Sequence, residues 1–160
     1  MKLIMLFVLS FATAAFAQDT SWQDLPLTDA QTGETFSLAD FAGQTVYVEP
    51  MATWCANCRQ QLGNVGKAKT QLGDKVTFVA LSVETTLKAD ELARYANDQG
   101  FDFTFAVMTP EVLRALAAAF GQSVTSPPST PHFIINPDGT ASELLTGFST
   151  PDEIVTAVQQ

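Results

Sequence analysis

Apolar residues in this chain gather in short runs that alternate with amphipathic segments. Runs rich in β-branched and aromatic side chains predict strands at residues 46–51, 75–83 and 101–108. Amphipathic spacing and capping residues predict helices after the first strand, at 87–99, at 109–120 and from Thr150 to the chain end. The run at 75–83 is almost continuously apolar, which is typical of a central parallel strand covered on both faces. The alternation indicates an α/β fold.

The first seventeen residues follow a different pattern. Lys2 is the only charged residue, an apolar stretch covers residues 3–16, and Ala15 and Ala17 place small side chains at the end. This is the pattern of a cleaved secretory signal, so we predict a signal peptide at 1–17 and one domain at 18–160. An uncleaved anchor is the alternative, although the apolar stretch is shorter than the ~20 residues that span a bilayer.

Charge narrows the choice of partners. The chain carries 8 basic and 17 acidic residues, a formal net charge of −9, and its sequence pI is about 4.3. A nucleic-acid-binding role lacks its electrostatic basis, so we expect no nucleic-acid partner. The acidity favours solubility and partners that are neutral or basic.

The two cysteines, Cys55 and Cys58, lie between the first predicted strand and the following helix. At a helix N-terminus the free amides stabilise a thiolate, which favours Cys55 as the nucleophile. Two intervening residues allow a disulfide, and such a pair can exchange two electrons with other thiols. A closed zinc site would need four ligands, and the chain has only one histidine. A purely structural disulfide would close too short a loop to stabilise the fold much.

Residues 52–59, ATWCANCR, resemble the active site of the thioredoxin superfamily, especially the bacterial TlpA/ResA/CcmG-type extracytoplasmic oxidoreductases. Trp54 is part of that pattern, and FSLADFAG at 36–43 matches a second segment of it. The resemblance covers about residues 25–158. It implies a thioredoxin-like sandwich with a mixed central β-sheet flanked by helices, an extra helix–strand insert, and no cofactor or metal.

The resemblance also implies roles for residues outside the cysteine pair. Glu49 occupies the position of a buried acid that takes and returns the proton of Cys58; a solvent-facing glutamate is the alternative. Thr130 and Pro131 match a residue and a cis-proline that hold the partner peptide, with an ordinary trans-proline as the alternative. Together with Trp54 they form the predicted partner-binding residues. Residues 136–139, NPDG, predict a hairpin leading to a strand near 142–146.

These observations predict an exported thiol–disulfide oxidoreductase in which an exposed Cys55 attacks and a buried Cys58 resolves. By resemblance we expect a monomeric, periplasmic or otherwise extracytoplasmic reductant. Its partners would be cysteine-containing exported proteins of the cytochrome c or copper-site maturation type, and a membrane thiol donor would recharge it. Two alternatives remain open: a thiol oxidant, and a non-catalytic copper- or thiol-binding module that uses the cysteines with His132 or Met51.

Overall fold

A central four-stranded sheet organises the molecule. The computed structural model describes residues 21–160, so the predicted signal peptide and its cleavage position lie outside the described residues. The strands are β3 (Thr45–Met51), β4 (Val76–Ser82), β5 (Thr104–Val107) and β6 (Phe133–Ile135). Their order is β5-β4-β3-β6. β3 runs parallel to β4 and β4 parallel to β5, whereas β6 is antiparallel to β3. The predicted mixed sheet is confirmed.

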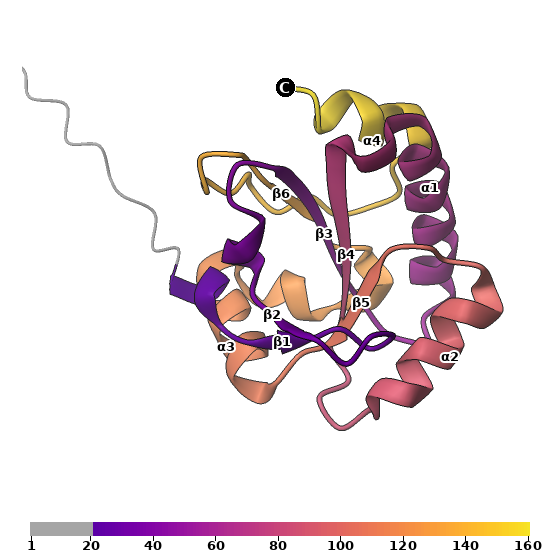
Figure 1. The fold of residues 1–160 in the computed structure, drawn as a ribbon, viewed down its shortest axis with the longest axis vertical. Coiled ribbons are helices and arrows are strands. Elements are labelled where there is room, and N and C mark those ends of the chain that lie inside the picture. Colours follow the sequence, from indigo (N-terminus) through magenta and orange to yellow (C-terminus); the bar gives the residue numbers. More distant parts are fainter. Residues whose placement is uncertain (1–20) are drawn as a thin grey trace, which may run out of the picture.

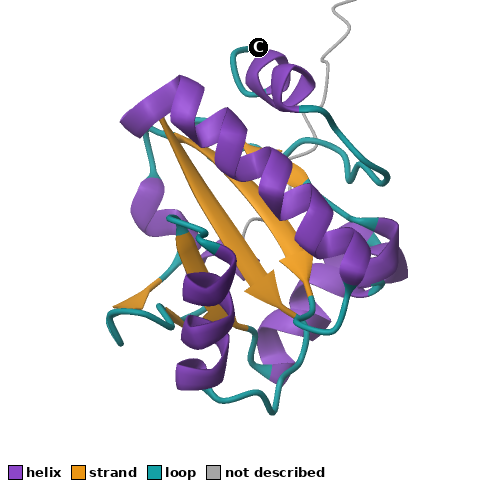
Figure 2. Cartoon of the chain, turned by 90° about the vertical axis from the view of Figure 1, so that its right-hand side faces the viewer, coloured by secondary structure: helices purple, strands orange, loops and turns teal. Residues whose placement is uncertain are grey.

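Helices cover both faces of this sheet (Figures 1 and 2). One face packs against α1 (Ala56–Leu72), α2 (Ala89–Gln99) and α4 (Pro151–Ala157). The other packs against α3 (Pro110–Phe120) and short 3-10 turns near the N-terminus. The unit α2–β5 is the predicted helix–strand insert between β4 and α3.

β3 contributes side chains to both cores because successive residues of a strand point to opposite faces. Val46 and Val48 pack with α3, whereas Tyr47 and Met51 pack with α1. In the ladder Tyr47 lies opposite Phe78 of β4 and Ile134 of β6. All of these side chains are at most 7% exposed. β3 is therefore a central strand that ends, buried on both faces, at the turn that carries the cysteines.

The N-terminal segment closes the α3 side of the sheet. Trp22, in a 3-10 turn at Ser21–Asp24, packs edge-on against Phe120 and Phe133. A two-stranded hairpin of β1 (Leu27–Thr28) and β2 (Thr35–Phe36) follows. Asp29 forms a bridge to Ala106 beside the edge strand β5. The N-terminal segment therefore packs over the α3 core and reaches the edge strand β5.

Helix ends match their capping residues closely. Thr109 and Thr150 cap α3 and α4 through their hydroxyl oxygens, and each is followed by a proline at the first helical position. α1 runs without interruption through Gly63. Within the predicted strand at 142–146 the structure has one isolated bridge, from Leu145 to His132, and a second bridge joins the preceding Ala141 to Ile135. No helix in residues 21–160 is long and apolar enough to cross a membrane.

Candidate active site

The cysteine pair lies where β3 passes into α1. Cys55 and Cys58 form a disulfide, with 5.3 Å between their Cα atoms. Cys55 is the N-cap residue of the 17-residue helix α1, and its Sγ accepts a hydrogen bond of 3.1 Å from the Cys58 amide. The free amides and the dipole at the N-terminus of a helix favour a negatively charged sulfur at the N-cap position. The geometry thus makes Cys55 the cysteine whose thiolate the helix stabilises.

Both cysteines are buried in the disulfide form. Cys55 is 3% exposed and Cys58 is 0% exposed. The predicted burial of Cys58 is confirmed, whereas the predicted exposure of Cys55 is wrong for this state. The reason is that Cys55 belongs to the core cluster at the start of α1, beside a second loop whose Pro127 carbonyl contacts Cys58.

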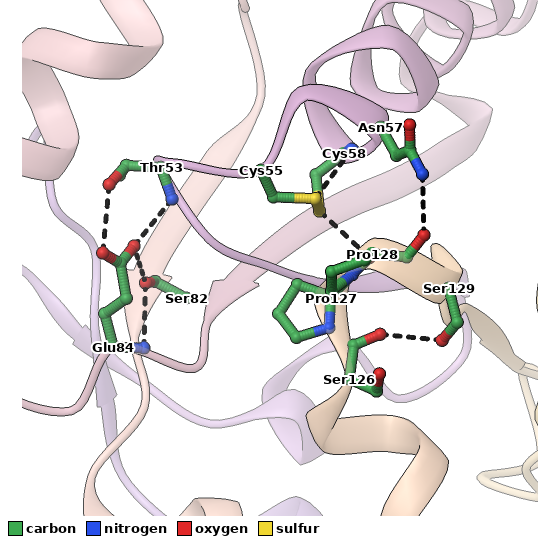
Figure 3. The surroundings of a disulfide bond; sticks show 10 residues. All are labelled: Thr53, Cys55, Asn57, Cys58, Ser82, Glu84, Ser126, Pro127, Pro128 and Ser129. Carbon is green, nitrogen blue, oxygen red and sulfur yellow. Dashed lines mark hydrogen bonds between the residues drawn. A yellow bond between two sulfur atoms is a disulfide. The ribbon is translucent and has the colours of Figure 1, made fainter.

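Figure 3 shows how that loop meets the helix. The Asn57 side-chain amide donates to the Pro128 carbonyl at 2.9 Å, and Cys58 Sγ lies 3.2 Å from the Pro127 carbonyl oxygen. A disulfide sulfur has no hydrogen to donate, so the second contact becomes a hydrogen bond only when Cys58 is a thiol. The carbonyl then favours the protonated form of Cys58. The two sulfurs have opposite partners, an amide for Cys55 and a carbonyl for Cys58.

Thr130 and Pro131 lie in this second loop, but their geometry differs from the prediction. The peptide bonds of residues 21–160 are all trans, so the predicted cis-proline is wrong. The chain instead reverses through a 3-10 turn at Pro127–Ser129 and a left-handed Thr130, with φ 48° and ψ 57°. The Thr130 amide donates to the Pro127 carbonyl at 2.8 Å, and its own carbonyl accepts from His132. Both backbone groups of Thr130 therefore have partners within the chain.

Glu49 is buried on the cysteine side of the sheet. It lies between Tyr47 and Met51 in β3, and these two side chains belong to the same core as Cys58. Glu49 is 1% exposed, and neither carboxyl oxygen has a hydrogen-bond partner among the described residues. Burial raises the pKa of this carboxyl well above its usual value. The predicted burial of Glu49 is confirmed, and a carboxyl with a raised pKa lies on the face of β3 that packs with Cys58.

A chain of polar side chains crosses the same core. Gln61 donates to the Tyr47 hydroxyl at 3.4 Å and accepts from the Ser149 amide at 3.0 Å. The Ser149 hydroxyl lies 3.3 Å from His132 Nε2, and the other ring nitrogen, Nδ1, lies 3.0 Å from the Thr130 carbonyl. Because a carbonyl only accepts, Nδ1 carries the hydrogen and the Ser149 hydroxyl donates to Nε2. Burial lowers the pKa of His132, which favours this neutral ring.

His132 was weighed from the sequence as a copper ligand beside the cysteines. Both of its ring nitrogens have protein partners here, and its ring stacks on Tyr47 with 5.5 Å between centroids. Within residues 21–160, no group of three or more His, Cys, Asp or Glu side chains is arranged to hold a metal ion. His132 is therefore a buried member of the chain of polar side chains that includes Ser149 and Gln61.

Sequence reasoning missed Gln61, Ser149 and Glu84. Glu84 follows β4 and accepts hydrogen bonds from Thr53, two residues before Cys55 (Figure 3). One signal for Glu84 was available, because carboxyl ends of neighbouring parallel strands meet at the same sheet edge. No comparable signal exists for Gln61 and Ser149, which are 88 residues apart. Trp54, which was predicted as a partner-binding residue, directly precedes Cys55 in the sequence, and its side chain is 64% exposed.

Several known proteins are similar to this chain in sequence or in fold. Thioredoxin-like protein YneN of Bacillus subtilis (strain 168) is 29% identical over 122 residues, 76% of this chain and 68% of that protein. A thiol:disulfide interchange protein of the thioredoxin family from Chlorobium tepidum TLS has a similar fold, with a TM-score of 0.68 and 22% identity over 84% of this chain and 90% of that one. A secreted Mycobacterium tuberculosis disulfide oxidoreductase homologous to E. coli DsbE matches with a TM-score of 0.68 and 17% identity, over 87% and 97%.

Residues 6–157 match the Redoxin family, almost the whole length of the chain. The matched region contains the sheet, the helices on both faces and the Cys55–Cys58 disulfide at the start of α1. The chain therefore belongs to the Redoxin family and is a thioredoxin-like thiol–disulfide oxidoreductase.

Proposed function

We propose that this protein is an exported reductant that transfers two electrons from the Cys55–Cys58 dithiol to disulfides of other exported proteins. The Cys55 thiolate attacks a partner disulfide, which forms a mixed disulfide and releases one partner thiolate. Cys58 then loses its proton and attacks Sγ of Cys55, which releases the second partner thiolate and forms the Cys55–Cys58 disulfide. The partner thiolates take up protons, and a membrane thiol donor returns the two electrons.

The order of attack is supported by the different hydrogen-bonding surroundings of the two sulfurs. Cys55 Sγ accepts from an amide at the N-terminus of α1, whereas Cys58 Sγ faces the Pro127 carbonyl. An amide stabilises a thiolate and a carbonyl stabilises a thiol. In the reduced protein Cys55 is therefore the attacking thiolate and Cys58 the protonated, resolving thiol.

Glu49 is proposed to accept the proton of Cys58 in the second step. Its carboxyl is buried on the same face as Cys58, has no hydrogen-bond partner in the described region, and has a raised pKa. A carboxyl with a pKa closer to neutral pH is a better general base for a thiol than one with an ordinary pKa. Because resolution needs Cys58 deprotonated and the first attack does not, Glu49 would act only in the second step.

The reductant direction is supported by the burial of both sulfurs, which opposes the stabilisation that the α1 N-terminus gives to the Cys55 thiolate. A strong oxidant owes its potential to a stabilised reduced form. Here both cysteines are buried, and the recorded hydrogen-bond partners of the sulfurs in the described region are one amide and one carbonyl. Burial in apolar surroundings disfavours a thiolate, which makes the disulfide relatively more stable. Export is supported by the sequence at 1–17 and by the secreted Mycobacterium tuberculosis neighbour.

The equilibrium potential of the pair tests the direction. We expect a value below the ~−180 mV of isomerase-like proteins when the protein is equilibrated with glutathione. Acid trapping of the protein from cells should then show a substantial reduced fraction that disappears when the membrane thiol donor is removed. A potential near the ~−120 mV of strong oxidants, with a fully oxidised pair in cells, would support the oxidant alternative instead.

A further inference from the structure

The turn between β3 and Cys55 is held by a side chain from the neighbouring strand. The regular hydrogen bonding between β3 and β4 ends where the Val83 amide donates to the Met51 carbonyl at 2.9 Å. Beyond this point the chain leaves the sheet to enter α1, so the next amides have no strand partner. The Glu84 carboxylate reaches across and accepts from the Thr53 amide at 2.6 Å and the Thr53 hydroxyl at 3.1 Å. A side chain thus replaces the backbone partner that β4 no longer supplies.

Glu84 is itself fixed at the end of β4. Its Oε2 atom also accepts from the Ser82 hydroxyl at 3.2 Å, and its amide donates to Ser82 Oγ at the same distance. Its carbonyl accepts from the Leu87 amide at 2.8 Å, which closes a turn behind it. Figure 3 shows the hydrogen bonds among Thr53, Ser82 and Glu84 on one side of the disulfide, opposite the Pro127–Ser129 turn. Because Glu84 is anchored, its carboxylate can hold Thr53 in one orientation.

Thr53 is two residues before the nucleophile, and the intervening residue is the exposed Trp54. Cys55 must keep its extended conformation, φ −86° and ψ 108°, for Sγ to cap α1. Trp54 is 64% exposed, so the direction of its ring depends mainly on the backbone of this turn. Through Thr53 the sheet can control both the conformation of Cys55 and the direction of the Trp54 ring. Two polar groups of Thr53 bind one carboxylate, which restricts its backbone and its side-chain rotamer together.

We propose that Glu84 is a positioning residue for thiol–disulfide exchange: through Thr53 it holds Cys55 Sγ at the N-terminus of α1 and Trp54 at the rim of the site. The inference rests on the exchange chemistry of the cysteine pair and is independent of the direction of electron flow. Within residues 21–160 Glu84 forms no hydrogen bond to either sulfur, so it acts through Thr53. The carboxylate is useful because one group can accept from several donors with charge-assisted hydrogen bonds.

Substitution of Glu84 separates positioning from a simple charge effect, because the two predict opposite signs. A nearby negative charge opposes a thiolate, so its removal alone would speed alkylation of Cys55 at acid pH. Loss of positioning takes the sulfur away from the helix terminus and would slow it. We expect iodoacetamide to modify Cys55 about twofold to fivefold more slowly at pH 6 in reduced Glu84→Ala. This range corresponds to the loss of the stabilisation that a helix N-terminus typically gives to a negative charge. The modified peptide is identified by mass spectrometry.

Matched variants make the result specific. Glu84→Gln keeps the size and one acceptor oxygen, so its rate should lie between those of the parent and Glu84→Ala. Thr53→Ser keeps the amide and the hydroxyl and should react at the parental rate, whereas Thr53→Ala loses one hydrogen bond and should be slowed less than Glu84→Ala. Glu143→Ala, which removes an exposed acidic side chain elsewhere, controls for net charge. Thr53→Ala and Glu84→Gln decide the question if Glu84→Ala does not fold.

Trp54 supplies a second measurement. In a Trp22→Phe background its fluorescence anisotropy should fall in Glu84→Ala, because the turn that orients the ring is loosened. Unchanged or faster alkylation of Cys55 in Glu84→Ala, or slower alkylation with unchanged Trp54 anisotropy, would overturn the proposal. Alkylation of the reduced protein requires no partner protein and no defined potential. A failure here is therefore distinguishable from a failure of the reductant assignment.

Discussion

The two cores on either side of the sheet are built from the same strands but differ in chemistry. The core against α3 consists of apolar side chains such as Val48, Leu81 and Leu116. The core against α1 also contains apolar side chains, but it includes the cysteine pair, and Glu49, Gln61 and His132 are buried on the same side. Alternation along β3 separates the two sets, since neighbouring residues point to opposite faces.

The difference shows how a small domain keeps stability and reactivity apart. A buried carboxyl without a hydrogen-bond partner destabilises the fold, because the group loses its hydration without compensation. Glu49 is such a group, and its side of the sheet therefore carries an energetic cost that the α3 side does not. We infer that the apolar α3 core and the capped helices offset this cost. Substitutions on the α1 face should therefore change both stability and cysteine reactivity, whereas substitutions on the α3 face should change stability alone.

The largest expected effect is on exchange itself. Cys55→Ser should lower the rate of disulfide reduction by about a thousandfold or more, because the attacking sulfur is lost. Cys58→Ser should instead accumulate a mixed disulfide, since Cys55 can attack but nothing resolves the product. Insulin reduction and non-reducing gel electrophoresis with a disulfide-containing target measure the two outcomes. Accumulation of mixed disulfide in Cys55→Ser, and not in Cys58→Ser, would reverse the assigned order.

A second comparison uses two leucines that are both 0% exposed, Leu116 on α3 and Leu62 on α1. Truncation of either to alanine should reduce the free energy of unfolding by about 3 kcal/mol, as for other buried leucines. Only Leu62→Ala should also change the pH profile of Cys55 alkylation, because Leu62 lies one helical turn after Cys58 in the same core. Urea unfolding gives the stabilities. An equal change of the alkylation profile in Leu116→Ala would show that the two cores are not independent.

The smallest expected effect concerns the pH dependence of stability. The pKa of Glu49 is raised from 4.5 by burial, so in the pH range above 4.5 the folded state holds this proton more tightly than the unfolded state. The contribution of Glu49 to stability is therefore complete below pH 4.5 and is lost as pH rises through the folded-state pKa. Glu49→Gln cannot ionise and should show a smaller decline of unfolding free energy between pH 4 and pH 8.

The control for this measurement is Glu143→Gln, which changes an exposed side chain and should follow the parent. The same Glu49→Gln variant should slow resolution of the mixed disulfide while leaving the first attack by Cys55 nearly unchanged. Parallel stability curves for Glu49→Gln and the parent would mean that Glu49 does not titrate in this range. Equal rates for both steps would leave Glu49 with a structural role only.

Much of this protein could be predicted from local sequence patterns. The apolar runs identified β3, β4 and β5, and the threonine–proline pairs at 109–110 and 150–151 identified the starts of α3 and α4. The position of Cys55 at a strand-to-helix turn followed from the same reasoning, whereas the burial of Glu49 was implied by the family resemblance. These features are predictable because hydrophobic periodicity and capping are expressed by residues close together in the chain.

Tertiary structure decided the features that depend on contacts between distant segments. Cys58 contacts the Pro127 carbonyl, 69 residues away, and Thr53 is held because Glu84 lies at the end of the adjacent strand, 31 residues away. The trans bond between Thr130 and Pro131 goes with a left-handed Thr130 whose carbonyl His132 binds. Which donor meets which acceptor across such separations depends on how the sheet and helices pack. For this reason the sequence by itself determined the elements and the reactive pair, whereas only the folded chain determined the surroundings that control it.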